Sequence, residues 1–163
     1  MILAIDPGTT HSGIVVIDEK QLNEKGAPKI IDRFKLDNQG VLDLIFTYGT
    51  FDQIVIEMIA SYGMAVGQTT FETCVWIGKF MLQAEILNIP VTRVFRKDIK
   101  LHICNNGRAK DTNVKQALID RFANEPNVNH GKGKKAFPDY FYGFKSDIWQ
   151  AFAVGIYFME TKK

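Results

Sequence analysis

The sequence has little of what cross-linked, zinc-stabilised or membrane proteins are built from. It contains two cysteines, Cys74 and Cys104, which form no zinc-binding pattern. Its apolar runs all fall short of the length that crosses a bilayer, and Met1 leads into an apolar run without a leader pattern. We therefore expect reduced thiols, no membrane association and a cytoplasmic location.

Charge of one sign is scarce as well. The formal net charge is +2, from 20 basic and 18 acidic residues. This balance predicts no global basic field, so any polyanion would be bound by local lysine clusters. The 163 residues, 46% of them apolar, predict a single domain, residues 1–163, with room for a three-layer core.

The most informative stretch is the first one. A short apolar run over residues 2–5 predicts a buried strand that ends on Asp6, and a Gly/Thr/Ser-rich turn then leads into a second strand at residues 13–17. A carboxylate beside such a turn suits a phosphate together with a metal ion, because backbone amides and hydroxyls can face phosphate oxygens. The alternative is that Asp6, Pro7 and Gly8 are only favourable turn residues.

Hydrophobic spacing along the rest of the chain indicates an α/β protein. The expected strands are residues 2–5, 13–17, 28–36, 52–57 and 91–95. The expected helices are residues 38–48, 69–88, 97–104 and 111–123, followed by a last helix capped by Ser146. Residues 61–68 and 125–145 are expected to be loops. Because a helix separates the third strand from the fourth, we expect the fourth strand to lie parallel to the first.

Three acidic residues stand at the ends of these elements. Asp6 follows the first strand, Glu57 ends the fourth, and Asp147 is expected in the first turn of the last helix. Side chains alternate along a strand, so Val55 and Glu57 lie on the same face of the fourth strand. If the first and fourth strands are neighbours, Asp6 and Glu57 should lie close together. Close carboxylates repel unless a cation neutralises them, and convergent acids without a nearby Arg or Lys indicate metal. For Asp147, a favourable contact with the helix dipole is an alternative reason.

Three segments together resemble the RuvC family of Holliday-junction resolvases. They are residues 5–13 (IDPGTTHSG), residues 55–57 (VIE) at a strand end, and residues 146–155 (SDIWQAFAVG) at the start of the last helix. The resemblance covers essentially the whole chain. It implies a ribonuclease H-like fold with a five-stranded mixed sheet flanked by helices. The divergence, including that of residues 131–142, looks more like a bacteriophage member, which would act in the cytoplasm of the bacterial host.

The resemblance also implies an activity and a cofactor. A member of this family would nick four-way and other branched DNA junctions symmetrically, leaving 5′-phosphate and 3′-hydroxyl ends. It would use two Mg²⁺ ions held by Asp6, Glu57 and Asp147, and Mn²⁺ would substitute. The family usually has Asp-x-x-Asp on the last helix, whereas this chain has Gln150 at the second position. The amide oxygen of Gln150 can still bind a metal, but it brings no charge. If Gln150 is no ligand, Asp139 is the next candidate.

Basic and aromatic residues are the candidates for DNA binding. Lys100 and Lys110 fall where the family keeps basic residues, and Lys100 is also a catalytic candidate that would stabilise the transition state. The other candidates are Lys132, Lys134, Lys135 and Tyr62. We expect residues 131–135 to be a mobile loop that binds phosphates, with a merely solvated loop as the alternative.

Two other functions compete with the nuclease. Actin-like ATPases and sugar kinases have a similar phosphate loop, but they need two lobes, and this chain has length for one. We therefore expect no nucleotide cofactor. A non-catalytic DNA-binding protein is the second alternative, and the acids argue against it because they would repel DNA without metal.

The long helix over residues 69–88 predicts self-association. Its apolar face is wider than packing on one sheet requires, and surplus apolar surface marks a partner. We expect a homodimer, which suits the two-fold symmetry of a four-way junction. Trp76 and Phe80 are the residues expected at its interface.

Overall fold

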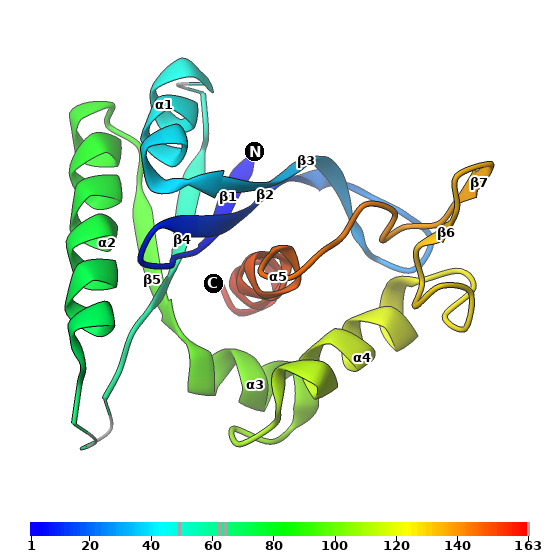
Figure 1. Ribbon diagram of the computed structural model, residues 1–163. Helices are drawn as coiled ribbons and strands as arrows, with labels where there is room; N and C mark the ends of the chain where they lie inside the picture. The colour runs from blue at the N-terminus through cyan, green and yellow to red at the C-terminus, as the bar shows by residue number, and fades with distance from the viewer. Residues whose placement is uncertain (49, 62, 64, 163) are drawn as a thin grey trace.

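The computed structural model describes residues 1–48, 50–61, 63 and 65–162, and its centre is a five-stranded mixed sheet (Figure 1). The strands are β1 (Ile2–Asp6), β2 (His11–Leu22), β3 (Pro28–Asp37), β4 (Gln53–Met58) and β5 (Val91–Phe95), in the spatial order β3-β2-β1-β4-β5. The first three form an antiparallel meander. β4 lies parallel to β1 and β5 parallel to β4. The expected α/β class, five-stranded mixed sheet and parallel pairing of the first and fourth strands are confirmed.

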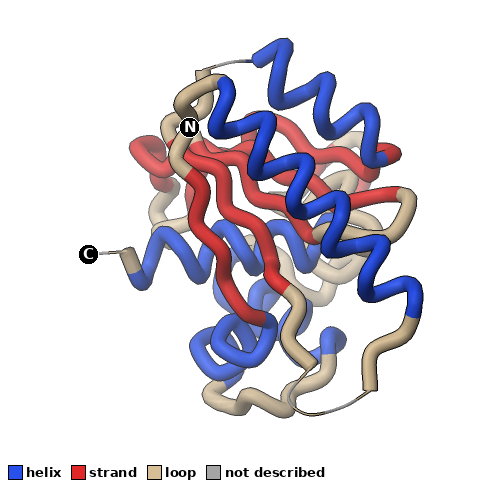
Figure 2. The backbone as a smooth tube through the Cα atoms, turned by 90° about the vertical axis from the view of Figure 1, so that its left-hand side faces the viewer, coloured by secondary structure: helices blue, strands red, loops and turns tan. Residues whose placement is uncertain are grey.

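Five helices accompany the sheet within the residues that the structure describes. They are α1 (Asn38–Tyr48), α2 (Gln68–Ile86), α3 (Arg96–Cys104), α4 (Asp111–Phe122) and α5 (Ile148–Thr161). α1 and α2 cover one face of the sheet and α5 lies on the other, where α3 and α4 form an outer layer (Figure 2). No helix in the described part of the chain is long and apolar enough to span a membrane.

Strand alternation divides the core into two clusters, one on each face. Ile2, Ala4 and Val55 point toward α5 and belong to one cluster. Leu3, Ile5 and their counterparts on β4 point toward α1 and α2 and belong to the other. The last residues of β1 and β4 on the α5 side are therefore Asp6 and Glu57, in step with Ala4 and Val55.

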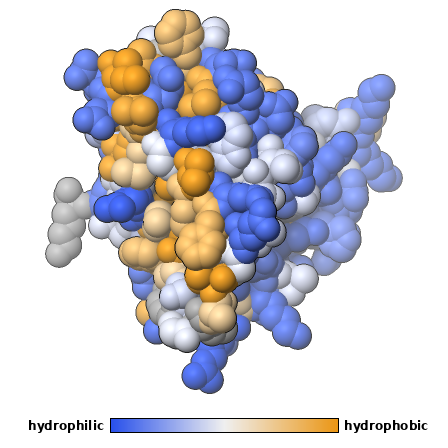
Figure 3. All heavy atoms as spheres, turned by 60° about the vertical axis from the view of Figure 1, so that its left-hand side comes forward, coloured by the Kyte–Doolittle hydropathy of each residue, from blue (hydrophilic) through white to orange (hydrophobic). Residues whose placement is uncertain are grey.

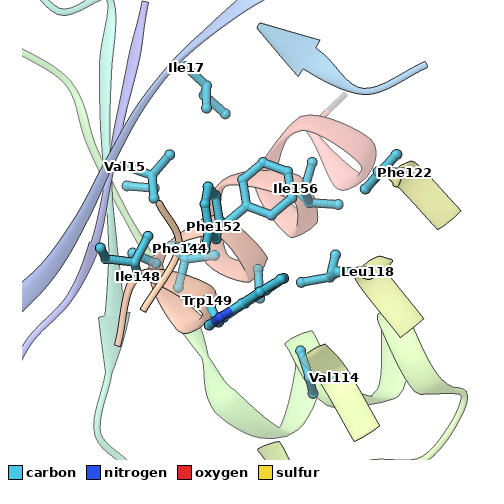
Figure 4. Packing of buried hydrophobic residues seen from close by; sticks show 14 of the residues in the cluster. Val15, Ile17, Val114, Leu118, Phe122, Phe144, Ile148, Trp149, Phe152 and Ile156 are labelled. Atoms are coloured by element: carbon cyan, nitrogen blue, oxygen red, sulfur yellow. The ribbon is translucent and has the colours of Figure 1, made fainter. Parts of the chain in front are cut away.

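α5 approaches the sheet closely because it carries small residues where it crosses β1 and β2. A Cβ atom on Gly155 would lie 3.0 Å from Ile17 and 3.3 Å from Ala4. On its other side, Trp149 and Phe152 pack toward α4, and Figure 4 shows them between the sheet and the α4 side chains. This packing sets the position of the first turn of α5, next to which Asp147 lies.

Residues 125–145, expected to be a loop, consist mostly of turns but also contain short strands and buried aromatic residues. This segment contains a small hairpin of β6 (Gly133–Lys134) and β7 (Phe137–Pro138), and it buries Phe141 and Phe144 completely. Hydrogen bonds from Asp139 N–H to the Lys132 carbonyl oxygen and from Phe141 N–H to the Gly131 carbonyl oxygen close it. Two-residue strands are too short to show a period of two, which is why the sequence pattern missed them.

Candidate active site

Asp6 and Glu57 come together at the end of the sheet because of the register between β1 and β4. Ile5 lies opposite Ile56, so Asp6 and Glu57 are the next positions on neighbouring parallel strands. Ala4 and Val55, two positions before these acids, belong to the α5-side cluster, so strand alternation places Asp6 and Glu57 on that same face. The expected convergence of these two acids is therefore present.

Asp147 lies near these two acids because a glycine on β2 lets the start of α5 approach the sheet. In the sheet Asp6 pairs with Gly13, and a Cβ atom on Gly13 would lie 2.4 Å from the backbone oxygen of Asp147. Only a residue without a side chain lets the start of α5 approach β2 this closely. Asp147 is the N-cap of α5 rather than a residue of its first turn, one position earlier than expected.

Two cations lie among these acids, contrary to the expectation of a site without nearby Arg or Lys. Arg96, the first residue of α3, donates to Glu57 at 2.7 Å and to Asp111 at 2.5 Å. Lys35 lies opposite Gly13 on β3 and forms an ion pair with Asp147 at 2.6 Å. The sequence pattern did not predict these two contacts, because Lys35 and Arg96 are distant from the acids in the chain and approach them only when the strands pair.

The pKa values of the acids follow these contacts. Burial raises the pKa of Asp147, but hydrogen bonds from Lys35 and Ser146 outweigh burial and hold it below its ordinary value. Burial, followed by the negative charges of Glu57 and Asp147, raises the pKa of Asp6 from 3.8 to about 8, with Arg96 opposing. Asp6 is thus the carboxyl group of the cluster that lacks sufficient positive charge.

This donor set fits a hard divalent cation in its chemistry. Carboxylate oxygens are the ligands that Mg²⁺ prefers, and the raised pKa of Asp6 marks a place where positive charge is missing. The described residues contain no group of three acidic, histidine or cysteine side chains gathered tightly enough to enclose an ion. The acids therefore form an open cluster, in which Arg96 and Lys35 neutralise part of the charge.

The turn between β1 and β2 is held by its own polar groups. The Gly8 N–H donates to the Ser12 hydroxyl at 3.3 Å, and that hydroxyl donates to Asn38 at 2.7 Å. The Asn38 amide in turn donates to the carbonyl oxygen of Gly8 at 2.9 Å. These groups fix the direction in which the chain leaves Asp6, so Gly8 N–H and Ser12 serve the turn itself.

Lys100 lies beside the acid cluster. Its ammonium group is 3.1 Å from Asp111, the same carboxylate that Arg96 contacts. Burial works against the charge on Asp111, but Arg96 and Lys100 outweigh burial and hold its pKa below its ordinary value. Asp111 therefore connects Lys100 to the acids, a role that the sequence pattern did not indicate.

Gln150 and Asp139 occupy different surroundings. Gln150 lines a pocket together with Asp111 and Lys132, and its side chain donates no hydrogen bond to the acids within the described residues. Asp139 accepts hydrogen bonds from the backbone N–H groups of Asn124, Glu125 and Tyr140. Asp139 thus ties the β6–β7 segment to the end of α4, and the structure gives it no place among the acids.

The remaining DNA-binding candidates differ in exposure. Lys110 is exposed directly before α4, and Lys134 and Lys135 are exposed on the β6–β7 hairpin, whereas Lys132 is half-buried. Tyr62 lies outside the described residues.

The outer face of α2 carries an apolar stripe. Phe71, Val75, Leu82 and Ile86 recur at helical spacing and are between 57% and 64% exposed. Figure 3 shows apolar side chains gathered on the side of the molecule formed by α1 and α2. Phe80 was wrongly expected in this surface: it is fully buried under α2, and Trp76 packs partly against the same core.

The chain resembles several solved structures in fold. Thermus thermophilus RuvC matches 98% of this chain over 95% of its own, with 16% identity and a TM-score of 0.66. The same protein in complex with Holliday junction substrate matches 96% of this chain over 90% of its own, with 14% identity and a TM-score of 0.67. Fowlpox virus resolvase in complex with substrate Holliday junction DNA matches 99% of both chains, with 15% identity and a TM-score of 0.53.

No protein-family model matches the sequence, and neither does any curated protein. At such low identities the likeness is one of fold. It confirms the expected ribonuclease H-like architecture and shows that this chain has the fold of RuvC.

Proposed function

We propose that the protein is a metal-dependent endonuclease that nicks four-way and other branched DNA junctions. The observation that carries the proposal is that Asp6, Glu57 and Asp147 meet at one edge of the sheet. Burial and the negative charges of the other two acids raise the pKa of Asp6 to about 8. The fold is the one found in the junction resolvases described above, which supports the choice of substrate.

Asp6, Glu57 and Asp147 would hold Mg²⁺, with the amide oxygen of Gln150 as a further ligand. When bound, a pair of such ions activates water and stabilises charge on the phosphate and on the leaving 3′ oxygen. That chemistry leaves 5′-phosphate and 3′-hydroxyl ends. The acids orient the ions, and a buried cluster of this kind keeps its charge only when cations are present.

The basic residues around the acids would act on the DNA. Lys100 is placed against Asp111 and next to Arg96, so its ammonium group can stabilise charge that develops on the phosphate. Lys110, Lys132, Lys134 and Lys135 would contact the DNA backbone, and Tyr62 remains a candidate for contact with DNA.

We further propose a homodimer formed through the stripe of Phe71, Val75, Leu82 and Ile86. An exposed apolar row on a helix whose opposite face is already buried has no role in the folding of the monomer. A two-fold dimer would present one acid cluster to each of two symmetry-related strands, which accounts for symmetric nicking.

The two alternative functions, an ATPase and a non-catalytic DNA-binding protein, fit these residues less well than a nuclease does. An actin-like or sugar-kinase ATPase would bind phosphate in the turn after β1, where Gly8 N–H and Ser12 already bond to each other and Asn38. A non-catalytic junction-binding protein would gain nothing from a buried, underneutralised Asp6 beside DNA.

One assay separates these functions. A labelled four-way junction and a linear duplex of the same arms are incubated with the protein and Mg²⁺ or EDTA, and ATP hydrolysis is measured in parallel. We expect Mg²⁺-dependent nicks at matched positions in two strands of the junction, no nicking of the duplex and no ATP hydrolysis. Ligation of the products by DNA ligase tests the expected end chemistry. Junction binding without cleavage at any divalent ion concentration contradicts the proposal.

A further inference from the structure

A pocket beside the acid cluster gathers three lysines from separate parts of the chain. It has a volume of about 260 Å³, and Lys115, Lys132 and Lys145 line it together with Trp149. Lys115 lies on α4, Lys132 directly before β6, and Lys145 ahead of α5. We call this the lysine pocket.

The lysine pocket shares residues with the surroundings of the acids. Ser146 and Gln150 line it, and in the chain they stand on either side of Asp147. Asp111 also lines it, and the carboxylate of Asp111 is bonded to Arg96, which contacts Glu57. A group bound in the pocket is therefore a neighbour of a group bound at the acids.

The three lysines bring more positive charge to the pocket than its described acidic residue, Asp111, can balance. None of the three takes part in an ion pair within the described residues, and the Asp111 carboxylate is already held by Arg96 and Lys100. Burial, and then the charges of Lys115 and Lys145, hold the pKa of Lys132 below its ordinary value. Three ammonium groups that face one hollow repel one another, and a bound anion removes that repulsion.

The lysines are also held in position. The Lys115 ammonium lies 5.2 Å from the centre of the Trp149 ring, and that ring is packed 4.7 Å from Phe141. Trp149 lies inside the aromatic core labelled in Figure 4. The site is thus partly assembled before any ligand arrives, which lowers the entropic cost of binding.

Lys132 owes its place to a neighbouring glycine. Gly131 has a φ of +71°, and a Cβ atom there would lie 2.7 Å from Ala123 at the end of α4. This close approach presses the segment against α4, the helix that carries Lys115. Lys132, the next residue, is therefore held close to the helix that carries Lys115.

We propose that Lys115, Lys132 and Lys145 together bind one backbone phosphate of the DNA strand that is cut, adjacent to the scissile phosphate. The hydroxyl of Thr112 lines the same pocket and suits a hydrogen bond to a phosphate oxygen. This inference rests on the proposed function, because it names the part of the nuclease substrate that the pocket takes. Its consequence is that the strand is fixed next to the acids, which positions the phosphate for attack.

The first test counts phosphates by the salt dependence of binding. Affinity for a four-way junction is measured against salt concentration in EDTA, so that binding is read without cleavage. The triple variant Lys115→Gln, Lys132→Gln, Lys145→Gln should lower the slope of log affinity against log salt by about 0.7–0.9, the contribution of one phosphate. A control that removes the same charge, Lys20→Gln, Lys29→Gln, Lys162→Gln, should leave the slope unchanged, because those exposed lysines line neither the pocket nor the stripe on α2.

An unchanged slope in the pocket variant overturns the proposal. A fall of about two units or more also contradicts it, because the lysines would then contact separate phosphates.

The second test locates the phosphate. Single neutral methylphosphonates are placed at successive positions around the cleavage point of the junction, and affinity is measured in EDTA. Wild-type protein should lose roughly tenfold at one position next to the scissile phosphate. The pocket variant should lose nothing more at that position and keep its sensitivity elsewhere. Equal sensitivity of both proteins at every position contradicts the proposal.

These readouts separate the two hypotheses. If the wild type nicks junctions and the pocket variant keeps its slope, the nuclease proposal stands and the pocket proposal fails. If nothing is nicked, the binding measurements still decide whether the pocket holds a DNA phosphate. A free anion is the remaining occupant: inorganic phosphate that stabilises wild type but not the pocket variant, with junction affinity equal in both, would assign the pocket to it and overturn our proposal.

Discussion

The two faces of the sheet are made by the same strands, yet one carries charge and the other apolar surface. On the α5 side, β1 and β4 end in Asp6 and Glu57, and Gly13 gives room to Asp147. On the other side the same strands present only Leu3, Ile5 and their neighbours to α1 and α2. The alternation of side chains thus separates the proposed chemistry from the proposed association, and each can be altered without the other.

The largest expected effect comes from the charged face. Asp6→Asn, Glu57→Gln and Asp147→Asn should each lower junction nicking by roughly a thousandfold or more, since the lost metal stabilisation amounts to several kcal/mol. Junction binding in EDTA should persist or tighten, because less negative charge faces the DNA. Single-turnover nicking and EDTA binding assays measure the two.

The matched control for these variants lies on the other face. Asp43→Asn removes an exposed carboxylate from α1 and should leave nicking at the wild-type rate. A core acid whose neutral variant also nicks at that rate does not belong to the site.

The second effect comes from the apolar face. Val75→Asp combined with Leu82→Asp puts two charges on the stripe and should weaken the dimer by at least about a hundredfold. Light scattering at micromolar concentration should then give the monomer mass. The wild type should nick both junction strands together, whereas this variant should nick one strand at a time.

Leu101→Asp is the control for the stripe, because Leu101 is similarly exposed but lies on α3. It should leave the mass of the dimer unchanged. A wild-type protein that is itself monomeric, or a stripe variant that keeps the wild-type mass, would remove the stripe from the interface.

The sequence predicted that the acidic residues converge, but it did not predict the basic residues that contact them. Short apolar runs and strand order suffice to bring Asp6 and Glu57 together, because parallel neighbouring strands end at the same edge of a sheet. The contacts of Arg96 and Lys35 with the acids were not predicted, because they depend on the register between strands, which no local sequence pattern shows. Phe80 was misplaced for a related reason: on a helix apolar on several sides, the sequence alone does not say which stripe faces the core.

A third, smaller effect is a dependence of stability on pH. Asp6 has a pKa of about 8 in the folded protein and 3.8 as its ordinary value, so between these values the folded state retains a proton that the unfolded state has released. The free energy of unfolding should therefore fall as pH rises through this window in the absence of divalent ions.

Thermal unfolding in EDTA at several pH values measures this dependence. Asp6→Asn should flatten it and raise the melting temperature most at the upper end of the window. Identical pH profiles for wild type and Asp6→Asn would show that Asp6 ionises as an ordinary carboxyl group.

The smallest effect concerns Gln150. Gln150→Asp should lower the Mg²⁺ concentration for half-maximal nicking by roughly severalfold, because hard cations are held chiefly by carboxylate charge. Mn²⁺ should support wild-type nicking at lower concentration than Mg²⁺ does. If Gln150→Asp and Gln150→Ala both leave the metal dependence unaltered, Gln150 is no metal ligand. It then serves only as part of the lining of the lysine pocket.

The central claim is that the charged face of the sheet holds divalent cations, and metal binding tests it most directly. Mn²⁺ is titrated calorimetrically into wild-type protein, Asp6→Asn and Asp43→Asn, each with and without a four-way junction, and binding to the junction alone is subtracted. We predict saturable binding by wild type and Asp43→Asn that strengthens with the junction and is lost in Asp6→Asn. Equal binding by Asp6→Asn and wild type, or no binding by any of them, would contradict the account.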